Sequence, residues 1–440
     1  MQKRLDIKPV LSIIPRPEHS ISREDISESA LKVLYRLKKA GFAAYLVGGG
    51  VRDLLLAKQP KDFDVATDAH PEEVRALFRN SRVIGRRFRL VHVRFGREII
   101  EVATFRGHHE QAEHASQAVV EEGLIIRDNV FGSLEDDAWR RDFTINALYY
   151  NIADFSVVDY TDAMIDLRSQ TLRMIGEPAI RLQEDPVRML RAIRFAAKLD
   201  FSLEEELERQ VLEQGERLEL ISPARLFEEV LKLFLSGYAE ETFGLLCRYQ
   251  LFPHLFAQTA ACLNEANPYV EQFITQALFN TDRRIKENKP VTPAFLFAAL
   301  LWPAVQQRSQ VKHENSLDDL PAMQEAGGDV IDYQLEQIAI PKRFRQPMLE
   351  IWGFQTRLEN RRGKRPLRLL GHPRFRAAYD FLLLRNSAGE SLQELCDWWT
   401  ALQEVGEDEQ HAMCKSVSPS RDKGRRRRKS KKKSASIKQQ

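Results

Sequence analysis

The sequence is poor in cysteine and contains no long apolar run. Its four cysteines, among 440 residues, form no close pair, which argues against a zinc ribbon and against a disulfide framework. No stretch of about eighteen apolar residues occurs, so we expect no transmembrane helix. The first twenty residues have neither an apolar core nor a small-residue cleavage site, so we expect no secretory signal and a cytoplasmic setting.

Negative charge is nearly absent from the C-terminal thirty residues. The whole sequence has a net charge of +3, whereas residues 411–440 contain twelve Lys or Arg and one acid, which leaves −8 for the first 410 residues. A segment so charged cannot fold alone, so we predict a disordered tail. Its cations Arg425, Arg426, Arg427 and Arg428 suit a polyanion such as RNA. An anionic membrane surface and a solubilising tail without a ligand remain alternatives.

Apolar periodicity divides the sequence into a mixed first part and a helical remainder. Helix-like runs occupy 27–39, 51–57 and 71–78, and strand-like runs occupy 43–49, 62–67, 91–95, 99–105, 147–153 and 157–160. After residue 160, helical periodicity interrupted by prolines continues to about residue 405. We predict an α+β fold in which a head with a small mixed β-sheet precedes an all-helical section. Loops are expected at 108–123 and 313–329.

Two carboxylates stand two residues apart in the predicted strand 62–67. Asp62 and Asp64 would point to one side of the strand, while Phe63 and Val65 would turn inward. Adjacent carboxylates repel each other unless a cation lies between them, and Mg²⁺ prefers one or two carboxylates together with phosphate oxygens and water. The pair therefore provides the minimum ligand set for two-metal nucleotidyl or phosphoryl transfer. Taken alone, such a pair is more often a polar strand face.

A glycine turn lies about ten residues before the acidic pair. Gly48, Gly49 and Gly50 let the backbone approach a triphosphate, and the amides of the following helix can point at it. Arg52 adds a fixed positive charge on the same side. The segment lacks both the P-loop ending G-K-[ST] and the dinucleotide-binding spacing G-x-G-x-x-G. By itself, a glycine triplet is more often a tight turn.

Together the glycine turn and the acidic pair form a specific pattern. It reads Gly48-Gly49-x-Val51-Arg52-Asp53-x-Leu55-Leu56, then five residues, then Asp62-x-Asp64. This pattern resembles motif A of the class II nucleotidyltransferases, the family of the bacterial poly(A) polymerases and the CCA-adding tRNA enzymes. The resemblance covers about residues 25–260 and continues more weakly into the helical remainder.

A second motif, Arg-Arg-Asp-Phe-Thr-Ile-Asn-Ala-Leu at 140–148, resembles the family's R-R-D-F-T-x-N-A motif. Guanidinium groups suit phosphate oxygens, and a carboxylate accepts a hydrogen bond from a ribose hydroxyl. The resemblance therefore implies nucleotide binding by Arg140, Arg141 and Asn146, and it places Asp142 with the catalytic residues. Without the family context, a surface Arg/Asp cluster would be the simpler interpretation.

A third motif, at 184–195, resembles the family's E-D-x-x-R motif. The proline after Asp185 suits a first helical turn, and Asp185 and Arg188 would then share one helical face. The resemblance implies that these two residues read the Watson–Crick edge of the base, and it adds Arg191 to the nucleotide-binding set. An intrahelical ion pair is the competing interpretation.

Glu101, in the predicted strand 99–105, matches the family's third acidic position and joins the predicted catalytic residues. A lone glutamate on a strand is otherwise usually solvated. The resemblance implies two Mg²⁺ ions, with Mn²⁺ as a substitute, held by Asp62 and Asp64, and ATP as the substrate.

Residues 83–93 bear on which of the family's two activities the chain has. This segment resembles the bacterial poly(A) polymerase branch, and its Arg86, Arg87 and Arg89 concentrate phosphate-contacting groups. It favours template-independent addition of AMP to RNA 3′ ends, with RNA-decay proteins as further partners. A basic strand edge is the simpler interpretation of the segment. A CCA-adding tRNA nucleotidyltransferase and a non-catalytic RNA-binding protein are the alternative functions.

The resemblance also implies a division of the chain into consecutive parts. These are an N-terminal arm (1–24), the nucleotidyltransferase head (25–165), a helical neck with the base-reading motif (166–235), an RNA-binding helical body and tail (236–410), and the disordered basic tail (411–440).

Overall fold

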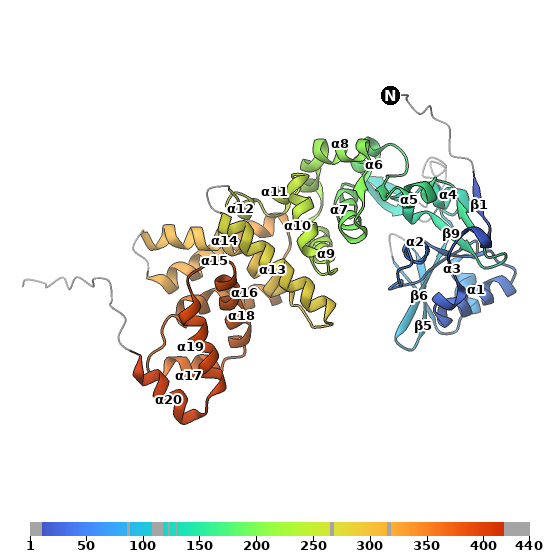
Figure 1. The fold of residues 1–440 in the computed structure, drawn as a ribbon. Helices are drawn as coiled ribbons and strands as arrows, with labels where there is room; N and C mark the ends of the chain where they lie inside the picture. The colour runs from blue at the N-terminus through green and yellow to red at the C-terminus, as the bar shows by residue number, and fades with distance from the viewer. Residues whose placement is uncertain are drawn as a thin grey trace, which may run out of the picture. The chain divides into compact units, whose positions relative to one another are not determined.

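The structure is a computed structural model that describes residues 11–85, 89–107, 118–121, 124–128, 130–264, 268–314 and 318–417. The chain forms two compact units, whose elements are labelled in Figure 1. The first unit comprises Met1–Ala261, Leu278–Val291 and Asp332–Ile340, and the second comprises Cys262–Ala277, Thr292–Ile331 and Pro341–Gln440. The predicted α+β fold is confirmed, because a mixed sheet is followed by a helical remainder.

An eight-stranded mixed sheet forms the centre of the head, in the order β1-β10-β9-β2-β3-β6-β5-β4. Strands β3 and β6 pair in parallel, and the other neighbours pair antiparallel. The strands are β1 (Ser12–Ile14), β2 (Ala44–Val47), β3 (Asp64–Thr67), β4 (Ser81–Ile84), β5 (Leu90–Phe95), β6 (Glu98–Thr104), β9 (Leu148–Asn151) and β10 (Val157–Asp159). Two small separate sheets pair β7 (Ala118–Glu121) with β8 (Leu124–Asp128) and β11 (Thr171–Leu172) with β12 (Ser202–Leu203).

Helix α1 (Glu28–Lys39) packs on β2, β3 and β6 of the sheet. It begins where the Ser27 hydroxyl accepts a hydrogen bond from the Ala30 amide at 3.1 Å, and it ends before Gly41, whose φ is 92°. Its apolar residues Ala30, Val33, Leu34 and Leu37 recur at helical spacing and are buried. The predicted helix at 27–39 is therefore confirmed. Helix α3 (Pro71–Leu77) also packs on the sheet, against β4, β5 and β6.

Two predicted elements around the glycine turn have different bounds in the structure. Helix α2 (Gly49–Leu55) begins two residues before the predicted helix 51–57, because Gly48 already serves as its N-cap. Strand β3 begins only at Asp64, so Asp62 precedes the strand that was predicted to contain it. The predicted hairpin of 91–95 and 99–105 is confirmed, with Gly96 at a φ of 61° in its turn.

Four segments predicted to be irregular contain regular structure. The predicted arm contributes β1, which pairs with β10 at the edge of the sheet. The predicted loop 313–329 lies largely in α15 (Asp319–Gln337). This helix contains Gly327 at a position where a larger residue would clash, because its Cβ would lie 2.9 Å from the Trp352 ring. The first residues of the predicted tail belong to α20 (Glu407–Ser416), and Cys414 in this helix is buried. The predicted loop 108–123 overlaps β7, and its other residues lie outside the described ranges.

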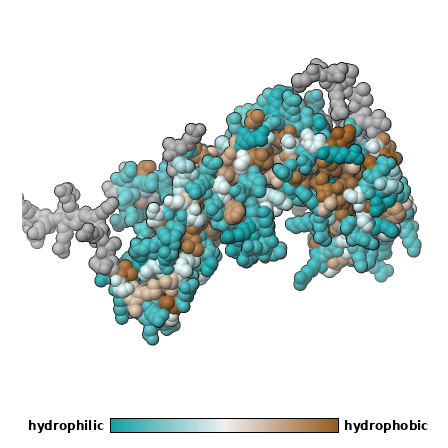
Figure 2. All heavy atoms as spheres, in the orientation of Figure 1, coloured by the Kyte–Doolittle hydropathy of each residue, from teal (hydrophilic) through white to brown (hydrophobic). Residues whose placement is uncertain are grey.

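Helices make up most of the chain after the sheet. In the first unit, Pro178 and Pro223 occupy the first positions of α6 and α9, where a missing backbone N–H has no cost. The helices are α4 (Leu134–Trp139), α5 (Ala163–Arg168), α6 (Pro178–Glu184), α7 (Val187–Leu199), α8 (Glu205–Gln214), α9 (Pro223–Phe234), α10 (Ala239–Arg248), α11 (Phe252–Leu255), α12 (Ala257–Ala260), α13 (Pro268–Lys286), α14 (Pro293–Glu314), α16 (Lys342–Leu358), α17 (Arg365–Leu370), α18 (Phe375–Ser387) and α19 (Gln393–Glu404). No helix in the described ranges is long and apolar enough to cross a membrane. Hydrophilic side chains cover most of the helical part on the face seen in Figure 2.

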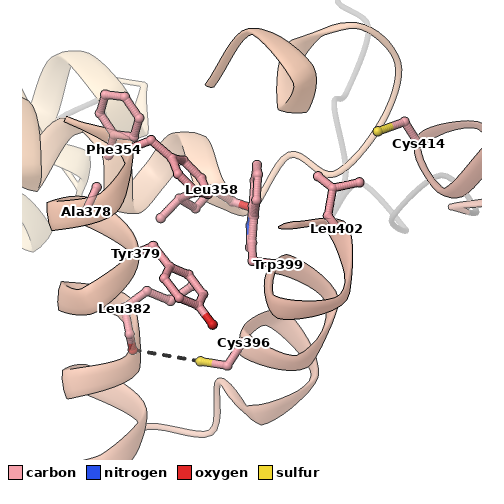
Figure 3. Close-up of a cluster of buried hydrophobic side chains, with 10 residues drawn as sticks. Phe354, Leu358, Ala378, Tyr379, Leu382, Cys396, Trp399, Leu402 and Cys414 are labelled. Atoms are coloured by element: carbon pink, nitrogen blue, oxygen red, sulfur yellow. Dashed lines mark hydrogen bonds between the residues drawn. The ribbon is translucent and has the colours of Figure 1, made fainter. Parts of the chain in front are cut away.

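The second unit has its own apolar core, in which Trp399 is fully buried (Figure 3). The indole N–H of Trp399 donates to the Leu358 carbonyl at 2.9 Å, which joins α19 to the end of α16. The Cys396 thiol lies 3.9 Å from the Leu382 carbonyl of α18. All four cysteines of the chain are free thiols.

Replacing Trp399 with Ala should destabilise the second unit by about 3–5 kcal/mol, because the change leaves a large cavity and an unpaired carbonyl. Urea-induced unfolding followed by circular dichroism measures this loss. Trp398, the partly buried neighbour, provides the control. An equally large loss for Trp398→Ala would contradict the assignment of Trp399 to the centre of this core.

Candidate active site

A row of paired residues crosses the sheet at the predicted acidic site. The register pairs Tyr149 with Val47, Val47 with Asp64, Asp64 with Glu101, and Glu101 with His92. Directly paired residues of neighbouring strands point to the same face of a sheet. Asp64 and Glu101, nearly forty residues apart in the sequence, therefore lie side by side on one face.

Asp62 reaches the site by a different route from the one predicted. Because β3 begins at Asp64, alternation along a strand does not fix the direction of the Asp62 side chain, which is exposed. Its backbone carbonyl lies against the glycine turn, where a Cβ at Gly50 would be 3.4 Å from this oxygen. Close backbone packing at Gly50 therefore holds the acidic pair beside the turn.

Asp62, Asp64 and Glu101, which we call the acidic row, place an excess of negative charge on this part of the head. Burial, with the neighbouring carboxylates of Glu101 and Asp62, raises the pKa of Asp64 to about 6, against the opposing effect of Arg141. A bound cation would relieve this repulsion, so the carboxylate donors fit a hard divalent ion. Within the described ranges no three acidic, imidazole or thiol side chains form a ready metal cluster. Glu101 instead contacts His92 Nε2 at 3.1 Å, a partner that was not predicted.

The glycine turn has a backbone conformation that only glycine adopts readily. Gly48 has φ 71° and ψ −133°, and its amide donates to the Leu148 carbonyl at the start of β9 at 3.3 Å. A Cβ at Gly48 would lie 3.5 Å from Nη1 of Arg141, and one at Gly49 would lie 3.5 Å from Nη2 of Arg52. The turn therefore presents bare backbone beside two guanidinium groups, which suits an anion.

Arg52 is more buried than the prediction of a ligand-facing charge implied. The residue is 2% exposed. It donates from Nε and Nη2 to Asp53 Oδ1 at 2.9 and 2.7 Å, and from Nη1 to Asn146 Oδ1 at 2.6 Å. A buried guanidinium requires such partners, because its charge has left water. Arg52 thus joins α2 to the 140–148 motif, and its contact with phosphate stays a prediction.

Asp142 is also more fully engaged than a free ribose acceptor would be. Its Oδ1 accepts from the Phe143 amide at 2.9 Å and from Asn146 Nδ2 at 3.2 Å. Its Oδ2 accepts from Nε and Nη2 of Arg191 at 2.8 and 2.5 Å. Although burial opposes ionisation, Arg191 lowers the pKa of Asp142 to about 2. A carboxylate offers about four lone-pair sites, so a ribose hydroxyl would have to displace one of these donors.

These contacts form one continuous hydrogen-bonded network, which begins with Lys198 Nζ donating to Asp53 at 3.2 Å. In order, it runs through Lys198, Asp53, Arg52, Asn146, Asp142 and Arg191. It connects the helix after the glycine turn, the 140–148 motif and helix α7. The network therefore ties all three sequence motifs together.

Asp137 holds the paired arginines and was not predicted from the sequence. It is 3% exposed and accepts from Arg141 Nη2 at 2.9 Å, from Tyr149 Oη at 2.7 Å and from Arg140 Nε at 3.3 Å. Burial disfavours its charge, but Arg141 and Arg140 lower the pKa of Asp137 to about 2. Asp137 lies three and four residues before the two arginines in a helical segment, and this spacing could have predicted the ion pairs.

Asp185 and Arg188 bind different partners instead of sharing one helical face. Asp185 is the C-cap of α6 and precedes α7, and its Oδ2 accepts from Arg225 Nη2 at 2.7 Å. Arg188 Nη1 donates to Glu184 Oε2 at 2.9 Å. The competing intrahelical ion pair is not formed, because Arg188 on α7 pairs with Glu184, the last residue of α6. Arg225, from α9, was not predicted. The base-reading role of Asp185 and Arg188 stays a prediction.

The predicted RNA-binding residues lie mostly outside the described ranges, where Arg86, Arg87 and the arginines at 425–428 fall. Arg89 is described and bonds to Glu72. A second group of cations, not predicted from the sequence, lies on α17 and the turn before it. Its members Arg362, Lys364, Arg365 and Arg368 are exposed, and no ion pair within the described part of the chain involves them.

Three family models match successive parts of the chain. The model for the poly A polymerase head domain matches residues 44–173, and that for the probable RNA and SrmB-binding site of polymerase A matches residues 200–263. The model for the polymerase A arginine-rich C-terminus matches residues 315–433.

Curated relatives extend this similarity to nearly the whole chain. Poly(A) polymerase I of Escherichia coli O6:H1 is 50% identical over 431 residues, which are 97% of this chain and 93% of the relative. The CCA-adding enzyme of Lactobacillus helveticus is 37% identical over 227 residues, 52% of this chain and 55% of the relative. The crystal structure of the Bacillus stearothermophilus CCA-adding enzyme with CTP has the same fold, with a TM-score of 0.57 at 23% identity, over 86% of this chain and 82% of that one.

Replacing Asp137 with Asn should make stability less dependent on pH. The folded carboxyl has a pKa of about 2, against about 3.9 in an unfolded chain. Its ionised form therefore stabilises the fold above about pH 4, and this contribution is lost as the pH falls toward 2. We expect the variant to be less stable than the wild type by about 2 kcal/mol at pH 7, with little difference near pH 2. Urea unfolding at several pH values measures this, and a difference that does not change with pH would contradict the ionic role of Asp137.

Proposed function

The chain belongs to the bacterial poly(A) polymerase family of nucleotidyltransferases, and we propose on this basis that it transfers AMP from ATP to RNA 3′-OH groups without a template, with release of pyrophosphate. The observation that carries the proposal is the single network from Lys198 to Arg191. Nucleotide transfer requires phosphate, ribose and base to be held in one geometry, and the network joins the segments assigned to each.

The acidic row is the proposed metal site. Asp62 and Asp64 would hold two Mg²⁺ ions, for which Mn²⁺ can substitute, and Glu101 would join them after exchanging its contact with His92. Bound there, the cations would polarise the transferred phosphate, activate the attacking hydroxyl and neutralise the departing pyrophosphate. The raised pKa of Asp64 supports this assignment, because burial and the nearby carboxylates of Glu101 and Asp62 outweigh the opposing charge of Arg141, and a divalent cation would stabilise the ionised carboxylate there.

The remaining residues of the site would bind and orient ATP. The turn at Gly48 lets the triphosphate approach the backbone, with Arg141 beside it. Asp142 and Asn146 would meet the ribose, and Arg191 keeps Asp142 ionised. Adenine carries an amino donor next to a ring acceptor, which complements a carboxylate and a guanidinium. We assign these two roles to Asp185 and Arg188.

RNA would be held by cationic side chains that do not take part in the proposed metal and ATP sites. The exposed group on and before α17, which lies in the segment matched as arginine-rich, can contact successive phosphates without breaking ion pairs. Arg86, Arg87, Arg89 and the arginines at 425–428 are proposed to contact RNA phosphates as well. We further propose a cytoplasmic setting and RNA-decay proteins as partners, since tails on many RNAs would serve RNA turnover.

Replacing Asp62 with Asn should abolish AMP incorporation, because the metal site loses an anionic ligand, while RNA affinity changes little. Primer extension with ATP and RNA binding without nucleotide measure the two properties. Asp200→Asn is the matched control, since Asp200 is an exposed, left-handed C-cap residue for which Asn is equally suited. Wild-type incorporation by Asp62→Asn would refute the metal assignment.

Replacing Lys364, Arg365 and Arg368 with Gln should weaken RNA binding and reduce its salt dependence. Each lost phosphate contact lowers the slope of log K against log salt by about 0.7, so the slope should fall by about 2. The control replaces Lys32, Lys289 and Arg308, which are exposed but ion-paired, and removes the same charge. Equal slopes for the two triple variants would show that net charge alone acts, and would exclude this RNA site.

A further inference from the structure

We propose that Arg181, on α6, is a positioning residue that fixes the base-reading turn against the phosphate-binding motif. The inference rests on the proposed function, in which Arg188 reads the base and the 140–148 motif binds ATP. Arg181 lies outside both motifs, and neither the sequence motifs nor the proposed mechanism gives it a role. Its guanidinium contacts both.

One side of Arg181 holds the backbone of the phosphate-binding motif. Nη2 donates to the carbonyl of Arg140 at 2.8 Å and to the carbonyl of Arg141 at 2.9 Å. Asp137 fixes the side chains of these two arginines, as described above, whereas Arg181 fixes the turn of the main chain from which both project. The position of this turn therefore depends on α6.

The other side of Arg181 holds the base reader. Nη1 donates to Glu184 Oε2 at 2.7 Å, and the same oxygen accepts from Arg188 Nη1 at 2.9 Å. Arg188 Nη1 also donates to the main-chain carbonyl of Arg181 at 2.6 Å. Arg188 is thus held by the Arg181 main chain and by Glu184, whose carboxylate the Arg181 side chain fixes in place.

The surroundings of Arg181 disfavour its charge and leave one of its N–H groups unpaired. Its side chain is 16% exposed, and its buried Nε has no hydrogen-bond partner within the described part of the chain. Burial and the nearby charge of Arg188 lower the pKa of Arg181. An apolar side chain would avoid both the unpaired N–H and the like-charge contact. An arginine is nevertheless suited to this position, because its planar guanidinium group can donate to two carbonyls and one carboxylate at the same time.

The distance between the 140–141 turn and Arg188 bears on the choice of nucleotide. Adenine and cytosine both present an amino donor beside a ring acceptor, so one carboxylate and one guanidinium can read either base. The two bases differ in how far that edge lies from the sugar. The spacing between the 140–141 turn and Arg188, which Arg181 sets, therefore distinguishes ATP from CTP.

The test compares Arg181→Met and Arg181→Lys in steady-state extension of an RNA primer with ATP and, separately, with CTP. In Arg181→Met we expect the KM for ATP to rise about tenfold and the ATP/CTP ratio of kcat/KM to fall about tenfold, with a smaller change in kcat, because hydrogen bonds to a charged group are lost. Arg181→Lys should recover part of the ratio, since it keeps the charge and one donor. An unchanged ratio and KM in Arg181→Met would overturn the proposal.

Two further variants separate the possible causes. Arg385→Met removes a buried, ion-paired arginine from the second unit, so it should lower the melting temperature without changing the KM or the ratio. If Arg181→Met behaves in the same way, its role is structural and the inference fails. Arg188→Ala tests the proposed function itself. If it alters the ATP/CTP ratio and Arg181→Met does not, only the inference fails, whereas an unchanged ratio in Arg188→Ala removes the basis of both.

Discussion

Asn146 makes the two hydrogen bonds on which the rest of the site depends. Its carbonyl oxygen accepts from Arg52 and its amide nitrogen donates to Asp142, so it joins two buried charged groups that have no direct bond to each other in the described network. Each charge in turn requires its own counter-charge, Asp53 for Arg52 and Arg191 for Asp142. The need to satisfy every buried charge fixes the glycine turn, the 140–148 motif and α7 relative to one another. These interactions therefore hold the three segments of the site in one geometry.

The local elements of the head and the motif residues could be predicted from the sequence, because apolar periodicity and glycine positions report local structure. Helix α1 and the β5–β6 hairpin follow from such signals. The position of Glu101 beside Asp64 does not, since it depends on a parallel strand pairing far along the chain. The sequence likewise did not show that Arg191, nearly fifty residues along the chain, and Asn146 donate hydrogen bonds to Asp142. Helix α15 was not predicted because the glycine pair at 327–328 is typical of a loop. The packing of Trp352 against Gly327 depends on the tertiary structure, which the sequence does not show.

Catalytic motifs alone do not separate tail addition from CCA addition. The CCA-adding relative matches 52% of the chain, whereas the poly(A) polymerase relative matches 97% and so includes the helical remainder. That remainder carries the exposed cations before and on α17, which make no ion pair with other described residues and suit RNA of any sequence. We propose that Asp185 and Arg188 read the base, and because adenine and cytosine offer the same kind of edge, the choice between them would depend on how this pair is held. Arg225, Glu184 and Arg181 hold that pair in the structure.

The central claim is that this site adds adenylate, and only adenylate, to RNA 3′ ends. It is tested most directly by incubating the wild-type chain and Mg²⁺ with each of the four nucleotides separately, on an unstructured RNA and on a tRNA that lacks its 3′ end. We predict long tails with ATP on both RNAs and no more than trace incorporation with CTP. Efficient CTP incorporation on the tRNA, with addition ending after a few residues, would contradict the claim and indicate a CCA-adding enzyme.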